Sequence, residues 1–324
     1  MTREQSPRTS EKEATLANVA LLYYGEGLTQ GDIARRMKVS RATIINMLKE
    51  ARDLRIVDIR VDGRHLSGSA LSAELRAKFG LQDVYIATCS KDDEGNKRED
   101  MLRHLGRVGA VAVADIVEAG DRVGVAWGET ILSVSEHMSK INMHDVSVHQ
   151  LIGSMISDSV PTSEKCTIDI ANMLSADCYT LHAPALASSA EVAALFKAEP
   201  TIRQQLEQLK SLDMTIASIG HTGDDTHLAR AQMASASELE DVRAAGAIGI
   251  ICCRYIDADG QPIKHPPDDR LIAVELENLV RVPKKLLIVG GVDRKDAVLA
   301  AIKGGFVTHL CVDHELAQAL RETP

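Results

Sequence analysis

The sequence predicts an α/β protein with a small helical N-terminal domain and a larger C-terminal domain built on a parallel sheet. The chain has 324 residues, about twice the usual domain size, and 45% of them are apolar, so we expect two domains, 1–62 and 63–324. Residues 29–54 show helical periodicity interrupted by a turn. Beyond residue 80, apolar strand-like runs alternate with helical stretches, which is typical of a parallel sheet covered by helices.

One helix is expected in the first 28 residues. Residues 1–12 are polar and lack periodicity, so we expect a flexible tail there. Apolar residues then recur at helical spacing from Leu16 to Tyr23. Gly25 and Gly27 follow, and they are natural places for this helix to end.

Two short helices joined by a tight turn are predicted between residues 29 and 54. Thr29 and Ser40 can each cap a helix start, because the hydroxyl accepts a hydrogen bond from a backbone N–H group. Ala34 is small enough to let the two helices approach closely. Lys38 stands at the turn where glycine is usual, so we expect a left-handed backbone that costs about 1 kcal/mol. The apolar side chains expected in the shared core are Ile33, Met37, Val39, Ile44 and Met47.

This spacing is that of a helix-turn-helix, and the local charge favours DNA binding. Residues 29–60 hold eight basic and four acidic residues, whereas the whole chain has a net charge of −9. A basic segment on an acidic body suits a module that binds phosphates. The alternative is an ordinary solvated helical hairpin. The residues expected to contact bases and backbone are Thr29, Gln30, Ser40, Arg41, Thr43, Asn46 and Lys49.

The segment after the helix-turn-helix should connect it to the sheet. Residues 56–62 alternate apolar and charged side chains, which predicts a small strand or wing before Gly63. A linker helix is expected from Ser67 to Phe79, ending at Gly80. The strand-like runs that follow are DVYIAT, DRVGVAW, VSVHQLIG, CYTLHAP, MTIASIG, AIGIICCRYI, RLIAVEL, KKLLIVGG and THLCVDH.

Composition excludes several classes of protein. No run approaches the roughly 20 apolar residues of a membrane span, and the N-terminus lacks the apolar region of a signal peptide, so a cytoplasmic location is expected. The six cysteines show neither CxxC nor zinc-site spacing, and we expect no metal, no disulfide framework and no cofactor. Cys252 and Cys253 should point to opposite faces of a strand and serve a structural role.

Two expected strand ends are candidate ligand sites, because ligands of open α/β sheets bind outside the carboxyl ends of the strands. Gly128 and Thr130 follow one strand at a helix start, where unpaired N–H groups can bind a phosphate or sugar oxygen. Another strand ends in two glycines, and Arg294 and Lys295 follow at a helix start, which suits an anion. The alternatives are glycines that only form turns and cations that face solvent.

Six motifs follow one another in order along nearly the whole chain: LLYYGEGLTQGDIARRMKVSRATIINMLKEAR, VGVAWGETILSV, HAPALASS, AGAIGIICCRYIDADGQPI, KKLLIVGG and THLCVDHELAQAL. With them the chain resembles the SorC-type (DeoR/CggR-type) sugar-binding transcriptional regulators. This resemblance implies a winged helix-turn-helix joined to a Rossmann-like, sugar-phosphate-isomerase-like effector domain. It also implies a homo-oligomer, a tetramer, on operator DNA, controlled by a phosphorylated sugar or polyol.

The resemblance also implies an effector site. By position it comprises Gly128, Thr130, Gly153, Ser154 and Arg294, where the family usually has Lys in place of Arg294. Gly249-Ile250-Ile251 stands where many members have GDI, so a carboxylate is lost, and QLIGSM has no arginine for a phosphate. A non-phosphorylated polyol is therefore a candidate effector beside sugars and sugar phosphates.

The expected function is a DNA-binding repressor of a carbohydrate or polyol catabolic operon, and not an enzyme. One alternative is a sugar-phosphate isomerase-like enzyme with an accessory DNA-binding arm, which would need a positioned base. Asp224, Asp225, His221 and His227 are candidates for that base, although such loop clusters more often form hydrogen-bonded turns or ligand contacts. The other alternative is a purely structural adaptor that binds neither DNA nor small ligands.

Overall fold

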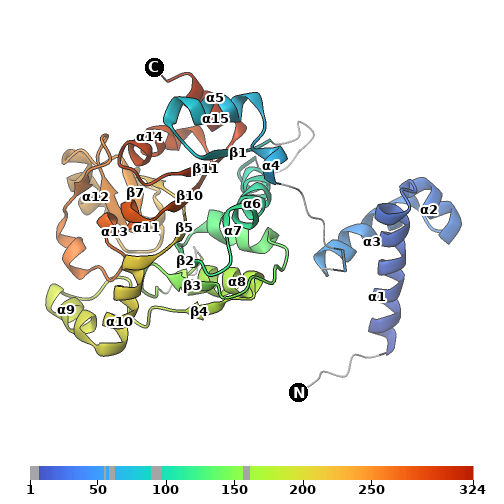
Figure 1. Cartoon of the computed structure of the whole chain (residues 1–324), viewed down its shortest axis with the longest axis horizontal. Helices are drawn as coiled ribbons and strands as arrows, with labels where there is room; N and C mark the ends of the chain where they lie inside the picture. The colour runs from blue at the N-terminus through green and yellow to red at the C-terminus, as the bar shows by residue number, and fades with distance from the viewer. Residues whose placement is uncertain (1–6, 55, 58–62, 89–96, 156–160, 324) are drawn as a thin grey trace. The chain divides into compact units, whose positions relative to one another are not determined.

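The structure is a computed structural model of the chain, and it describes residues 7–54, 56–57, 63–88, 97–155 and 161–323. The chain divides into two compact units, Met1–Arg60 and Val61–Pro324. Figure 1 shows the first as a group of helices and the second as a sheet covered by helices. Each unit is described by itself below.

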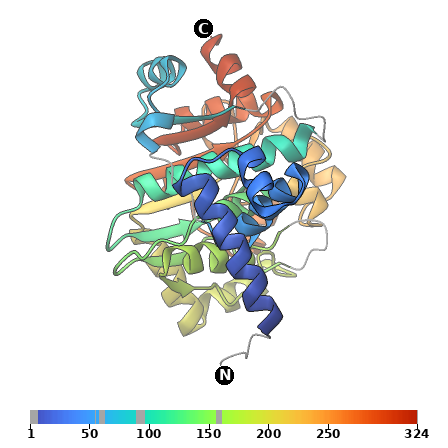
Figure 2. The ribbon, with the colours of Figure 1, turned by 90° about the vertical axis from the view of Figure 1, so that its right-hand side faces the viewer.

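The N-terminal unit consists of α1 (Pro7–Ala20), a π-helical turn η1 (Leu21–Gly25), α2 (Gln30–Met37) and α3 (Arg41–Asp53). Figure 2 shows α1 as one long helix with the shorter helices packed beside its C-terminal half. Their shared core is made by Leu16, Val19, Ala20, Ile33, Ala34, Ile44, Leu48 and Ala51.

The expected tail over residues 1–12 is wrong from Pro7 onward, where α1 begins; the residues before it lie outside those described. The C-terminal half of α1 packs in the core and so provides the costly helix nucleus. Each turn added towards the N-terminus then gains hydrogen bonds at low entropic cost. Proline is tolerated in a first helical turn, and the Lys12 ammonium forms an ion pair with Glu50 on α3. Polar composition alone therefore does not end this helix.

The turn between α2 and α3 has the predicted local chemistry. The Thr29 hydroxyl accepts a hydrogen bond from the Asp32 N–H group at 3.2 Å, and the Ser40 hydroxyl accepts one from Thr43 at 3.0 Å. Lys38 is left-handed as expected, with φ of 55°. Val39 is 38% exposed, so its expected place in the core is wrong. It lies in the turn, outside both helices, while Ile33, Ala34 and Ile44 fill the space where the helices cross. The expected wing falls mostly outside the described residues.

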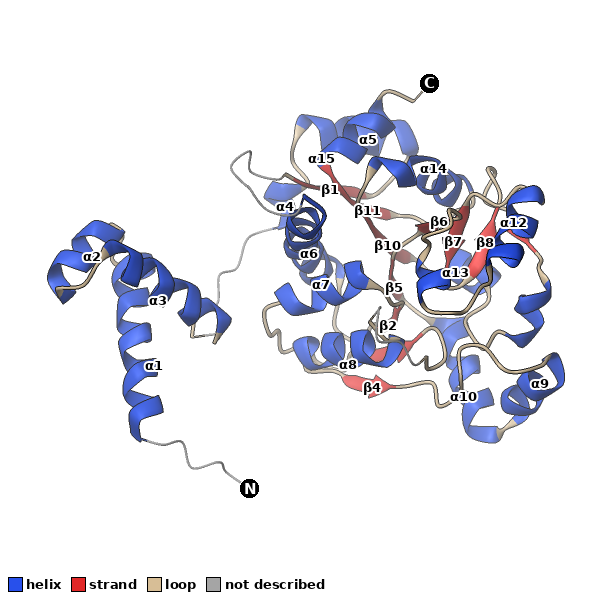
Figure 3. Cartoon of the chain, turned by 180° about the vertical axis from the view of Figure 1, so that it is seen from behind, coloured by secondary structure: helices blue, strands red, loops and turns tan. Residues whose placement is uncertain are grey.

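The C-terminal unit is built on a seven-stranded parallel sheet with the strand order β1-β11-β10-β5-β2-β3-β4. Each neighbouring pair is parallel, as the alternating pattern predicts. Figure 3 shows the strands crossing the unit from β1 to β4. Their bounds are β1 Asp83–Ala87, β2 Arg122–Val125, β3 Ser147–Gln150, β4 Asp177–Tyr179, β5 Met214–Ala217, β10 Lys284–Val289 and β11 His309–Asp313.

Helices cover both faces of this sheet. On one face lie α6 (Lys97–Ile116), α7 (Glu129–His137) and α8 (Ser163–Leu174), as Figure 1 shows. The expected linker helix over Ser67–Phe79 is α5 (Ala70–Phe79), which begins after the cap at Ser69 and ends at Gly80, as predicted. The short α4 (Gly63–Leu66) precedes it and was not predicted. The other helices are α9 Ala190–Ala198, α10 Pro200–Gln208, α11 His227–Arg230, α12 Ala236–Ala244, α13 Leu276–Arg281, α14 Lys295–Lys303 and α15 His314–Arg321, with 3-10 turns at η2 Leu209–Ser211, η3 Pro266–Arg270 and η4 Val292–Arg294.

A second, antiparallel sheet of β6 (Gly220–His221), β7 (Gly249–Ile251), β8 (Arg254–Ile256) and β9 (Pro262–Ile263) was not predicted. The run AIGIICCRYI is a hairpin, β7 to β8, and not one strand. Cys252 and Cys253 form its two-residue turn with φ of 47° and 64°, so the expectation that they lie on opposite faces of a strand is wrong. Positive φ at both turn positions matches the twist of a tight hairpin. Both cysteines are buried.

The run RLIAVEL does not join the seven-stranded sheet. It follows η3, and its residues make isolated bridges, Leu271 with Leu186 and Ala273 with Ile152. The run is buried and apolar, and burial alone does not distinguish a sheet strand from an extended segment that packs against the edge of a core.

Candidate functional site

A cavity of about 320 Å³ lies where the carboxyl ends of β2, β5 and β10 meet. This is the edge of a parallel sheet at which ligands bind in open α/β folds. The walls come from the start of α6, the turn before α7, the segment after β5, α11 and the turn after β10. The lining residues are Arg98, Met101, Leu102, Trp127, Gly128, Glu129, Thr130, Ser218, Ile219, Gly220, His221, Asp225, Thr226, His227, Arg230, Gly290, Gly291, Asp293 and Arg294.

One wall is the start of α7. Gly128 precedes the helix with φ of 121°, a conformation that favours glycine, and no side chain caps this helix end. The first N–H groups of α7 and the Thr130 side chain are therefore beside the cavity, together with the partial positive charge of a helix N-terminus. This wall can hold a ligand oxygen.

A carboxylate between two arginines lines the cavity. Glu129 Oε1 accepts a hydrogen bond from Arg230 Nη2 at 2.7 Å, and its Oε2 accepts one from Arg98 Nη2 at 2.6 Å. Burial disfavours the ionised carboxylate, but the two arginines outweigh that effect, and the pKa of Glu129 lies below its ordinary value. Both arginines come from sequence segments far from α7, so the fold alone brings the three together.

The opposite wall is the turn from β10 into α14. The Gly291 N–H group donates a hydrogen bond to Asp313 Oδ2 at 2.6 Å, and Asp313 Oδ1 accepts another from Leu316 at the start of α15. Asp313 is buried, so its two hydrogen bonds hold the turn after β10 against the start of α15. Arg294 donates to the Gly290 carbonyl, and its guanidinium lines the cavity.

Two histidines, His221 and His227, line the cavity. His221 Nδ1 accepts a hydrogen bond from the Gly223 N–H group at 2.9 Å, so that nitrogen carries no proton. Its Nε2 lies 3.7 Å from Asp225 Oδ1 and 3.8 Å from Asp293 Oδ2. Burial, aided by the charge of Arg294, lowers the pKa of His227 to about 4. His227 also makes an edge contact with Trp127, with ring centroids 5.1 Å apart.

The structure brings together some of the residues expected at the effector site. Gly128, Thr130 and Arg294 line the cavity. Gly153 and Ser154 do not line it: their N–H groups donate to the carbonyls of Ile272 and Ala183, and a Cβ at Gly153 would lie 2.6 Å from the Ala183 carbonyl oxygen. Lys295 begins α14 and is also absent from the lining residues.

Three of the four residues considered as a catalytic base line the cavity, and the fourth does not. Asp225, His221 and His227 line the cavity, whereas Asp224 Oδ1 accepts a hydrogen bond from Arg243 at 2.6 Å. Sequence reasoning missed Arg98 and Arg230 as site residues. Arg98 stands in a polar stretch at the start of the long α6, and nothing local to it predicts a site. Only its ion pair with Glu129 in the folded structure identifies Arg98 as a residue of the site.

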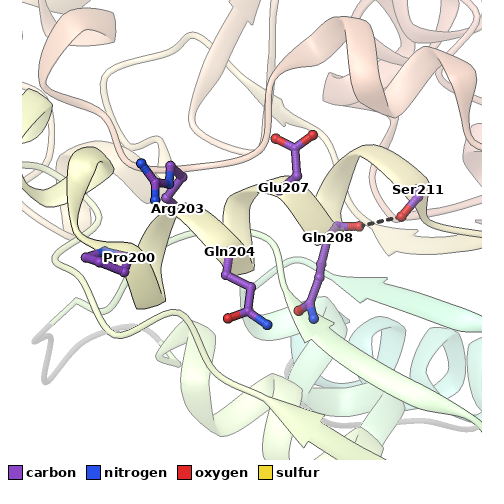
Figure 4. Close-up of a pocket in the computed structure, with 6 residues that line it drawn as sticks. All are labelled: Pro200, Arg203, Gln204, Glu207, Gln208 and Ser211. Carbon is purple, nitrogen blue, oxygen red and sulfur yellow. Dashed lines mark hydrogen bonds between the residues drawn. The ribbon is translucent and has the colours of Figure 1, made fainter.

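A second, open hollow of about 730 Å³ follows the outer side of α10. Figure 4 shows that its lining side chains all come from this helix and the 3-10 turn after it. The Ser211 hydroxyl donates to the Gln208 carbonyl at 3.2 Å, which is a local turn contact. Polar groups from different elements do not converge here, so we assign no ligand site to it.

The seven expected DNA contacts lie on α2, on α3 and at their starts. The Thr29 and Ser40 hydroxyls cap the two helices, and Arg41 Nε donates to Gln30 Oε1 at 3.3 Å. Arg41, Thr43, Asn46 and Lys49 are exposed, while Ile44 and Leu48 on the same helix are buried. The face of α3 that the sequence predicts to read DNA is therefore solvent-facing within its unit.

Comparison with known proteins decides the family. The family described as "Putative sugar-binding domain" matches residues 65–321. The "Uncharacterized transcriptional regulator YjhU" of Escherichia coli strain K12 is 33% identical over 99% of this chain and 98% of its own length. The chain belongs to the SorC-type sugar-binding transcriptional regulators. The "Sorbitol operon regulator" of Klebsiella pneumoniae, a further SorC-type relative, is 26% identical over 94% of this chain and 96% of its own length.

The fold of this SorC-type chain agrees with a solved structure. The crystal structure of the full-length sorbitol operon regulator SorC from Klebsiella pneumoniae matches with a TM-score of 0.71 and 24% identity, over 96% of this chain and all of that one. The predicted α/β class is thereby confirmed, and the family resemblance is confirmed by the family match and by the relative that is 33% identical. The relatives are transcriptional regulators, so the expectation of a regulator and not an enzyme is also confirmed.

None of the helices described for this SorC-type regulator combines the length and the apolar character needed to cross a membrane. Among the residues that the structure describes, no three His, Cys, Asp or Glu side chains are grouped so that they could hold a metal ion.

Proposed function

We propose that this SorC-type regulator represses a carbohydrate or polyol catabolic operon and is released when a sugar, polyol or sugar phosphate occupies the cavity at the ends of β2, β5 and β10. The observation that carries the proposal is that cavity. Helix starts, arginines, carboxylates and one tryptophan from separate segments converge on it. As part of the same proposal, residues 1–62 bind DNA and residues 63–324 bind the effector and form the oligomer.

For DNA binding, the proposed recognition helix is α3. Arg41 and Asn46 present a guanidinium and an amide, which are suited to the major-groove edges of guanine and adenine. Lys49 and the residues at the two helix starts, Thr29, Gln30 and Ser40, are proposed to contact phosphates, and Thr43 a base or phosphate. The buried side of α3 supports this orientation, because Ile44 and Leu48 fix which face is free.

For the effector, Gly128, Thr130 and Arg294 are the proposed contacts among those expected from sequence. Glu129, Arg98, Arg230 and Trp127 join them because they line the same cavity. We propose no direct effector contact for Gly153, Ser154 and Lys295, whose backbones shape the strand and helix ends nearby.

The experiment is a fluorescence-anisotropy titration of the full chain with DNA from the intergenic region next to its own gene. Binding is expected to weaken with salt, because phosphate contacts release counterions. Arg41→Ala should weaken binding at least about tenfold, the loss expected for one bidentate base contact. The control Arg281→Ala removes the same exposed side chain from α13 and should leave binding unchanged. Equal affinity for Arg41→Ala and the native chain would refute α3 as the recognition helix.

The proposed oligomer has its own measurement. Light scattering on the purified chain should give a mass four times the 35.1 kDa of one chain if the tetramer is correct. A mass of 35.1 kDa for the protein alone, with one chain for each DNA molecule in the complex, would contradict the oligomer and leave the DNA-binding test standing.

A further inference from the structure

Charge in the effector cavity is already balanced by the protein itself. The charged lining residues within the described part of the chain are three arginines and three carboxylates: Arg98, Arg230, Arg294, Glu129, Asp225 and Asp293. Of the two lining histidines, His227 is neutral above a pKa of about 4, and His221 Nδ1 accepts a hydrogen bond from the Gly223 N–H group. A ligand therefore meets a polar cavity in which the arginines and the carboxylates are equal in number.

The arginines that would attract an anion are already engaged by protein oxygens. Glu129 accepts hydrogen bonds from Arg98 and Arg230, one on each carboxylate oxygen, at 2.6 and 2.7 Å. Arg294 donates to the Gly290 carbonyl and lies 3.8 Å from Asp293 Oδ2. A phosphate would have to displace Glu129 or lie beside it, and two negative groups in contact repel each other strongly in a partly desolvated site.

Glu129 also stands at a helix start, where negative charge is favoured. It is the first residue of α7, so its carboxylate lies in the first turn of a helix whose N-terminal N–H groups have no side-chain cap. An acidic side chain in a first turn satisfies the same positive potential that draws phosphate to helix starts. The protein thus supplies its own anion at this end of the cavity.

We propose that the cavity takes an uncharged sugar or polyol, and that Glu129 is the residue that excludes phosphorylated and carboxylated forms of the same compound. This inference rests on the proposed function, which assigns the cavity to the effector. Hydroxyl groups both donate and accept, so vicinal hydroxyls bridge the Glu129 carboxylate and the adjacent arginines without adding charge. The Trp127 ring supplies an apolar surface for the C–H face of the ligand.

The test uses Trp127 as the reporter, because it is the single tryptophan of the chain and lines the cavity. The full chain is titrated with inorganic phosphate at constant ionic strength while Trp127 fluorescence and the thermal denaturation midpoint are followed. The native chain, Glu129→Gln and the control Glu136→Gln are compared. Glu136 is exposed on the same helix and outside the cavity, so it tests for a general loss of one negative charge.

Glu129→Gln is expected to bind phosphate saturably and at least tenfold more tightly than the native chain, whereas Glu136→Gln should behave like the native chain. Circular dichroism establishes first that the variants are folded. Saturable binding of phosphate by the native chain as tight as that by Glu129→Gln would overturn the proposal. So would absence of phosphate binding in both, because Glu129 would then not be the excluding group.

A second arm uses only the native chain and does not depend on any variant folding. Uncharged sugars and polyols are compared with their monophosphates in the same assay. Binding of an uncharged compound with no response to its monophosphate supports the inference. Preference for a monophosphate overturns it while leaving the regulator proposal intact. Failure of the full chain to bind DNA would instead remove the regulator proposal and leave the phosphate result unchanged.

Discussion

Lys38 has a strained backbone conformation in the turn between α2 and α3. Its φ of 55° is left-handed, which costs a non-glycine residue about 1 kcal/mol or more. Lys38→Gly should therefore stabilise the N-terminal unit by about 0.5 kcal/mol, the remainder being lost to the greater freedom of glycine in the unfolded chain. Circular dichroism during urea denaturation measures the change.

The matched control for Lys38 is Lys49→Gly, the same substitution within α3. Glycine in a helix interior costs about 1 kcal/mol relative to a good helix former, so this variant should be destabilised. If Lys38→Gly also destabilises the unit, the lysine side chain must contribute more to stability than the strained backbone costs.

His227 predicts a pH dependence of folding stability. Burial holds its pKa near 4 in the folded state, whereas an unfolded histidine titrates near 6.5. Between these values the unfolded chain binds a proton that the folded chain does not, so stability falls as pH decreases from 6.5 towards 4. The free energy of unfolding of the native chain falls between pH 7 and pH 5, and His227→Gln should reduce that fall by about 1–2 kcal/mol, measured by urea denaturation. Exposed His144→Gln is the control and should keep the native pH dependence.

At the residue scale, sequence predicts what local chemistry decides. The caps at Thr29 and Ser40 and the left-handed Lys38 depend only on neighbours along the chain, and they are confirmed. Of the cavity, Gly128 and Thr130 were predictable because they follow a strand and begin a helix. Arg98 was not, since its partner Glu129 is brought to it by tertiary packing alone.

At the element scale, hydrophobic runs predicted the parallel strands, because strands buried on both faces are almost continuously apolar. The same signal could not separate a strand from a hairpin at Cys252-Cys253, since cysteine is unusual in a turn that requires two positive φ angles. It also failed at RLIAVEL, where a buried extended segment has the same composition as a strand.

The close packing of α6 on α7 predicts a large effect from one methyl group. A Cβ at Gly106 would lie 2.2 Å from the Ser133 side-chain oxygen and 2.6 Å from its carbonyl oxygen. Gly106→Ala should therefore separate the helices and lower the free energy of unfolding by about 1–3 kcal/mol, measured by denaturant titration of Trp127 fluorescence. Gly31→Ala in α2 has space for a methyl group and should instead be neutral or stabilising.

For the whole molecule, the proposed function predicts coupling between effector and DNA. A saturating effector should change the DNA affinity of the chain by about 5- to 150-fold, and a repressor requires that the change be a weakening. By linkage, saturating DNA must weaken effector binding, read from Trp127 fluorescence, by the same factor. Equal affinities in the two DNA titrations would show that the cavity does not control DNA binding, even if both ligands bind.

The glycine contacts between α6 and α7 have a mechanical consequence for this coupling. With 20 residues, α6 is about 30 Å long, and its two ends lie in different surroundings. Arg98 near its start lines the cavity. Asp115 near its end accepts a hydrogen bond from the Tyr85 hydroxyl and lies beside Gly63, the first described residue after the connection to the N-terminal unit. Gly106 places α6 in close contact with Ser133 of α7, with no space for one further methyl group. The proposed function therefore predicts that a ligand which displaces Arg98 and Glu129 also displaces Asp115 and the segment that begins at Gly63.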